Sequence, residues 1–105
     1  MKDLMGLMKQ AKDMQKKMEI AQAKVADLSV EGQSASGRVL VGLVGGGNMR
    51  TLKIDPALVS SEDVEMLEDL IVAAYQDAKI KLDEAQAQTM KDTVGDIQLP
   101  PGLSL

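Results

Sequence analysis

Apolar residues recur at alternating intervals of three and four along the start of the chain. This spacing places them at positions a and d of a heptad repeat and predicts a long helix over residues 1–28 with one apolar face. Such a face packs on another helix, in the same chain or in a second copy. The residues of this predicted seam are Leu4, Leu7, Ala11, Met14, Met18, Ala21, Val25 and Leu28.

The size of the chain limits the core that it can build alone. It has 105 residues, which is one small domain, and its single aromatic residue is Tyr75. A core must therefore come from aliphatic residues and from the eight methionines. Because a domain of this size buries a limited fraction of its surface, we expect a homodimer that shares helices between chains.

Glycines then interrupt the helical pattern, and β-branched or alternating stretches lie between them. The stretches LSVEGQS, GRVLVGLV and NMRTLKID predict three strands of a small antiparallel sheet within residues 29–55. We expect the GGGN segment, residues 45–48, to form a hairpin loop, because Gly and Asn tolerate the positive φ of tight turns. Val39, Val41 and Leu43 should share one face of the middle strand.

A second helical pattern follows the strands. Ser60 fits the N-cap and Asp63 fits the capping-box acid of a helix over residues 60–94. The tail, residues 95–105, contains adjacent prolines and should be extended. These elements predict one α+β domain over residues 1–105, with the order helix, three strands, helix.

Composition excludes several classes of function. Without Cys or His, the chain lacks a disulfide, a thiolate nucleophile, the usual general base and the usual transition-metal ligands. The acids at residues 62–69 do not follow the spacing of a calcium loop, and the helix dipole alone favours acids there. We therefore expect no catalysis, metal, cofactor or small-molecule substrate. No signal peptide or membrane-spanning run is visible, so we expect a soluble cytoplasmic protein.

Charge is segregated along the chain. The stretch MKQAKDMQKKMEIAQAK, residues 8–24, carries five lysines against two acids, although the formal net charge is -4. Residues 55–105 carry three lysines against eleven acids. The five lysines of this stretch lie off the predicted seam; they are Lys9, Lys12, Lys16, Lys17 and Lys24. Such a stripe is either a solvated face or a phosphate contact, and an acidic helix alongside it would cancel its field.

Four stretches resemble the YbaB/EbfC family of bacterial nucleoid-associated proteins. They are GLMKQAKDMQKKM near the start, KIDPALV after the third strand, MLEDLIVAAYQDA in the second helix and LPPG near the end. The resemblance implies a tweezer-like homodimer whose projecting helices bind duplex DNA with little sequence preference, and it implies a place in the nucleoid. It also implies that Lys9, Lys12, Lys16 and Lys17 contact DNA, whereas the second helix offers only Lys79, Lys81 and Lys91.

We therefore interpret the chain as a dimeric DNA-binding protein whose lysines contact phosphates. The alternative is a dimeric protein-interaction module whose lysines serve only solubility. RNA is disfavoured because the chain has no aromatic platform on which bases could stack.

Overall fold

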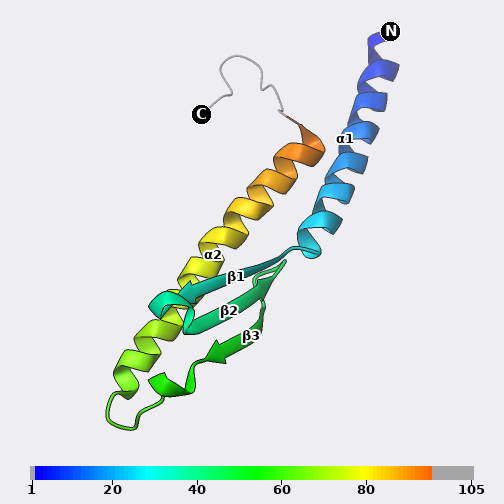
Figure 1. Cartoon of the computed structure of the whole chain (residues 1–105). Coiled ribbons are helices and arrows are strands. Elements are labelled where there is room, and N and C mark those ends of the chain that lie inside the picture. The colour runs from blue at the N-terminus through cyan, green and yellow to red at the C-terminus, as the bar shows by residue number, and fades with distance from the viewer. Residues whose placement is uncertain (1, 96–105) are drawn as a thin grey trace, which may run out of the picture.

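The computed structural model describes residues 2–95 and has the predicted α+β fold (Figure 1). Its helices and strands are α1 (Lys2–Ala26), β1 (Ser29–Ser34), β2 (Val39–Val44), β3 (Met49–Ile54) and α2 (Val64–Val94). Two short 3-10 turns, η1 (Ala35–Gly37) and η2 (Pro56–Leu58), were not predicted. Of the extended tail expected over residues 95–105, only Gly95 is among the described residues.

The three strands form the predicted antiparallel sheet, and their order in it is β1-β2-β3. The loop between β2 and β3 is the expected hairpin, closed by a hydrogen bond from the Gly47 N–H to the Val44 carbonyl oxygen, 2.9 Å. Gly46 and Gly47 carry the positive φ that the turn requires, at 93° and 88°. Asn48 does not, so the two glycines alone supply the left-handed conformation.

The helix α2 crosses one face of the sheet, over β1 and β2, and the core lies between these layers. Val39, Val41 and Leu43 share the covered face of β2 and are fully buried, which confirms the prediction. The helix contributes Ala74, Ala78 and Leu82 to this core. β3 lies outside the cover of α2, so Leu52 stays 42% exposed.

The close contact of α2 with the sheet depends on a glycine in β1. A Cβ atom built on Gly32 would overlap the Ala78 amide nitrogen and lie 2.6 Å from Ala78 Cα. The same atom would lie 2.5 Å from the carbonyl oxygen of Ala74. The helix backbone therefore rests directly on the strand, and only a residue without a side chain fits between them.

Side chains of α2 also close the outer edge of β1. The Gln33 N–H donates to Asp77 Oδ2 at 2.9 Å, and Lys81 Nζ donates to the Glu31 carbonyl oxygen at 3.2 Å. The hydrogen bond from the Gln33 amide and the contact with Lys81 hold the pKa of Asp77 below its usual value. Exposed strand edges pair readily with other chains, and these two contacts occupy the edge groups of Glu31 and Gln33.

The C-terminal half of α1 packs on α2 and fixes the direction of the helix. Ala21 is fully buried, and Met18 and Val25 are half-buried. The end of α1 lies against Gly45 of the hairpin loop, where an added Cβ would lie 2.8 Å from Ala26 Cα. From this anchor, α1 runs past the C-terminal end of α2, and its N-terminal half projects from the body (Figure 1).

The second helix begins later than predicted. Its N-cap is Asp63, whose carboxylate accepts a hydrogen bond from the Met66 N–H at 3.3 Å, so Ser60 is not the cap. The Ser60 hydroxyl instead accepts from the Glu62 N–H, 3.2 Å, in the turn that precedes the helix. Both residues suit an N-cap locally, and the turn after η2 decides between them. The helix ends at Val94, as predicted.

The first helix is also slightly shorter than the predicted span of residues 1–28, because it ends at Ala26. The chain must leave the helix there to enter β1 at Ser29. Leu28, the last seam residue, is therefore outside the helix, but it still packs at the edge of the core.

We predict that Gly32→Ala destabilises the protein by about 1–3 kcal/mol, because the new methyl group would force α2 away from the sheet. Gly6→Ala is the matched control. A Cβ on Gly6 meets nothing within 4 Å, so alanine there should stabilise α1 by about 0.5–1 kcal/mol. Urea unfolding of both variants at one protein concentration measures the two effects. Equal stability of Gly32→Ala and the unmodified chain would contradict the close packing.

Candidate nucleic-acid interface

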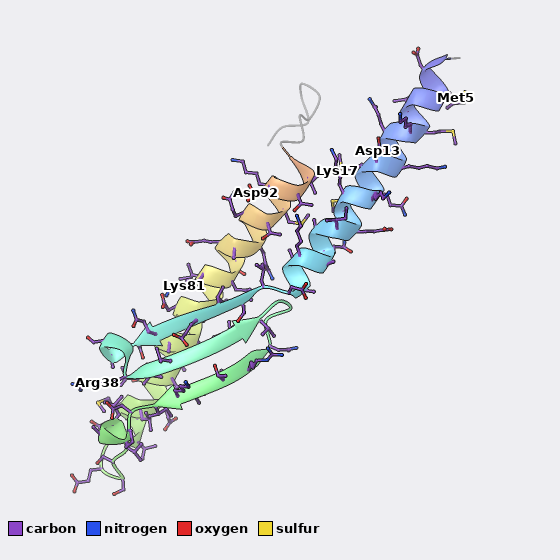
Figure 2. The ribbon with its side chains drawn as sticks, turned by 45° about the vertical axis from the view of Figure 1, so that its right-hand side comes forward. Met5, Asp13, Lys17, Arg38, Lys81 and Asp92 are labelled. Carbon is purple, nitrogen blue, oxygen red and sulfur yellow. The ribbon has the colours of Figure 1, made fainter. Side chains whose placement is uncertain are left out.

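The projecting part of α1 is the most exposed segment of the described chain. Every residue from Asp3 to Lys17 is exposed, and we call this segment, residues 3–17, the arm. Figure 2 shows Lys17 beside the end of α2, and Asp13 and Met5 successively further out. The arm is therefore a single helix that the rest of the described chain leaves uncovered.

The lysines that the sequence singled out all lie on α1 and are all exposed. Lys9, Lys12, Lys16 and Lys17 belong to the arm, and Lys24 continues the stripe toward the sheet. Among residues 2–95, the ion pairs are Lys79 with Asp83 and Lys81 with Asp77, and both lie within α2. Within the described chain, the α1 lysines thus keep their charge available to an outside anion.

Two of the three lysines of α2, Lys79 and Lys81, are engaged with acids of the same helix. Lys79 Nζ lies 2.6 Å from Asp83 Oδ1, and this hydrogen bond raises the pKa of Lys79. Lys81 Nζ lies 3.1 Å from Asp77 Oδ2 and also contacts the edge of β1. These contacts make Lys79 and Lys81 poorer candidates for DNA contact than the α1 lysines.

The structure separates the acidic end of α2 from the arm. The acids at residues 62–69 lie at the start of α2, next to η2, whereas the arm extends past its other end (Figure 1). A helix of 31 residues is about 46 Å long, and the Debye length at physiological salt is about 8 Å. Salt therefore screens these acids from the arm. Figure 2 places Arg38 at the acidic end as well, far from Met5.

The predicted seam divides into two parts. Its C-terminal part contacts the body, with Met18, Val25 and Leu28 half-buried. Its N-terminal end is uncovered in the single chain, since Leu4 is 61% exposed and Leu7 60%, whereas Met14, at 37%, is partly covered. Packing of this part on a second chain stays a prediction.

Sequence reasoning missed two exposed methionines on the arm. Met5 and Met8 occupy positions b and e of the heptad, off the seam, and are 77% and 56% exposed. Together with Lys9 and Lys12 they line one shallow hollow of about 300 Å³. The heptad positions already separated these two residues from the seam, although their apolar character suggested a core role.

Two other kinds of functional feature, a metal-binding cluster and a membrane-spanning helix, are absent from the described residues. Within residues 2–95, no three His, Cys, Asp or Glu side chains come together in a group that could hold a metal ion. None of the described helices combines the length and apolar character needed to cross a membrane.

Comparison with known proteins agrees with the resemblance seen in the sequence. The model of the YbaB/EbfC DNA-binding family matches residues 1–97. A nucleoid-associated protein of Gluconobacter oxydans is 54% identical over 100% of this chain and 98% of its own. A nucleoid-associated protein of Rhizobium meliloti is 48% identical with the same coverage. Among solved structures, an uncharacterized protein of Helicobacter pylori matches with a TM-score of 0.66 and 26% identity, over 88% of this chain and 94% of that one.

Proposed function

Because the chain belongs to the YbaB/EbfC DNA-binding family, we propose that it binds duplex DNA as a homodimer, through contacts between the α1 lysines and DNA phosphates. The names of its relatives support a place of action in the nucleoid. The proposed activity is binding, without a chemical reaction. Lysines on an exposed helix contact the phosphate backbone, and such contacts give little sequence preference.

The observation that carries this proposal is the state of the lysines on the arm. They are exposed, they have no ion-pair partner among the described residues, and the acidic end of α2 is screened from them. Neutralising phosphates releases the counterions that DNA condenses, which drives binding and makes it weaken as salt rises. The net charge of -4 does not oppose this, because screening makes the local charge of the arm decisive.

The shape of the single chain supports the homodimer. Its radius of gyration is 20.4 Å, whereas a compact domain of 100 residues has about 13 Å. Apolar side chains are left uncovered on the sheet face beside α2, with Met49 45% and Leu52 42% exposed, and along the arm. A second copy that covers such surfaces would supply the burial that the small core of one chain lacks.

We predict that Lys9, Lys12, Lys16 and Lys17 changed together to Gln abolish most DNA binding without unfolding the protein. Fluorescence anisotropy with a random-sequence duplex measures affinity across salt concentrations. If one arm contacts four phosphates, log K falls against log salt with a slope of about -3.6, and about twice that if both arms bind. For the variant with all four lysines changed to Gln, log K should depend little on log salt.

Two double variants test whether DNA binding depends on where the lysines lie or only on the total charge of the protein. Lys9→Gln with Lys12→Gln and Lys79→Gln with Lys81→Gln remove the same charge from α1 and from α2. The first pair should flatten the slope by about 1.8 for each arm that binds, and the second should leave it nearly unchanged. Equal losses from both pairs would contradict the assignment to the arm. DNA affinity that does not change with salt concentration would instead favour the protein-interaction module.

The homodimer has its own test. Light scattering after size exclusion should give twice the chain mass of 11.2 kDa, and this value should persist on dilution into the low micromolar range. A mass of one chain at every concentration would contradict the dimer, even if DNA binding were observed.

A further inference from the structure

Two apolar side chains share the lysine-bearing side of the arm. Met5, Met8, Lys9 and Lys12 follow the spacing i, i+3, i+4, i+7, which places all four on one face of a helix. They line the shallow hollow on the arm, and Figure 2 shows Met5 pointing away from α2. The methionine–lysine face, as we call these four residues, therefore presents apolar and cationic groups together to the outside.

The two methionines have no packing role in the described chain. The core is formed by β2 and α2, and the predicted seam runs along another side of α1 through Leu4 and Leu7. Soluble helices usually carry polar residues on such an outer face. Met side chains are flexible and adapt to irregular apolar partners. The neighbouring lysines give the face a positive charge, so its charge is complementary to a polyanion.

The geometry of duplex DNA limits which groove the helix can enter and which base groups these methionines can contact. An α-helix with its side chains is about 10–12 Å across, which fits the major groove, about 12 Å wide, but not the minor groove, about 6 Å wide. The base edges in the major groove present hydrogen-bonding groups and one apolar group, the 5-methyl of thymine. The face has no Arg, Asn or Gln, and if its two lysines contact phosphates, its base contact is apolar.

Resting on the proposed DNA binding, we propose that Met5 and Met8 contact thymine 5-methyl groups in the major groove while Lys9 and Lys12 contact the adjacent phosphates. The methionines thereby give the arm a loose preference for thymine-containing duplex. The lysines supply affinity, and the methionines supply the discrimination that phosphate contacts lack.

Replacing thymine by deoxyuridine tests this directly, because the change removes only the methyl group. Anisotropy at one salt concentration should show weaker binding to the deoxyuridine duplex, by about fourfold for each thymine methyl group that a methionine buries. Met5→Ala with Met8→Ala should bind both duplexes equally and keep the salt slope of the unmodified chain. Alanine favours helix, so the arm should stay folded, which circular dichroism checks.

A methionine outside the arm serves as the control. Met66, in the first turn of α2, is 37% exposed, and Met66→Ala should leave the discrimination between the two duplexes intact. If the Met5 and Met8 variant still discriminates, the preference arises from the shape of the duplex and the proposal is wrong.

Other outcomes separate the proposal from the function on which it rests. Salt-dependent binding with equal affinity for both duplexes would overturn the methionine contact and leave phosphate binding in place. Absence of binding to either duplex at low salt would overturn the proposed function itself. Phosphatidylglycerol vesicles are the remaining probe. If the methionine variant loses vesicle binding while the unmodified chain binds both duplexes equally, the face contacts lipid and the proposal fails.

Discussion

The direct contact between the backbones of β1 and α2 determines the form of this protein. Gly32 lies against Ala74 and Ala78, so α2 sits close on the sheet and follows its length. Because α2 has 31 residues and the strands six each, the helix extends past the sheet and offers α1 a surface on which to pack. Ala21 and the contact at Gly45 then fix the root of α1. The arm projects because α1 continues beyond the end of this surface.

The same arrangement separates the charges. The strands between the two long helices reverse the chain, so the start of α1 and the start of α2 lie at opposite ends of a molecule 74 Å long. Five acids at residues 62–69 lie at the end of the molecule opposite the arm, many Debye lengths from the arm lysines. In α2 itself, lysines and acids form i, i+4 pairs, which contribute little stability on an exposed surface. They do, however, hold the ammonium groups of Lys79 and Lys81 against the carboxylates of Asp83 and Asp77. An acidic protein can thus present a cationic helix.

Local sequence patterns predicted where the helices and strands lie better than they predicted how these elements pack and how far apart they are. Alternation in β2 predicted the buried face of Val39, Val41 and Leu43, and the glycine run predicted the hairpin. The N-cap was misplaced because Ser60 and Asp63 both satisfy the local rule, and the preceding 3-10 turn decides. The heptad pattern predicted a seam but could not show that α2 ends beside Lys17, which leaves Leu4 and Leu7 uncovered in the single chain. Likewise, no sequence pattern could show whether the acidic helix cancels the lysine stripe, because that depends on the distance between elements.

The proposed role of the arm is tested most directly by an amide nitrogen–proton correlation spectrum of labelled protein titrated with a random-sequence duplex. Chemical-shift changes and line broadening should concentrate on the arm, around residues 5–17, and decrease toward the sheet. The first turns of α2 should be unaffected, because their acids repel phosphate. Changes centred on α2 or β3, with the arm unperturbed, would contradict the proposal that α1 is the DNA-binding element.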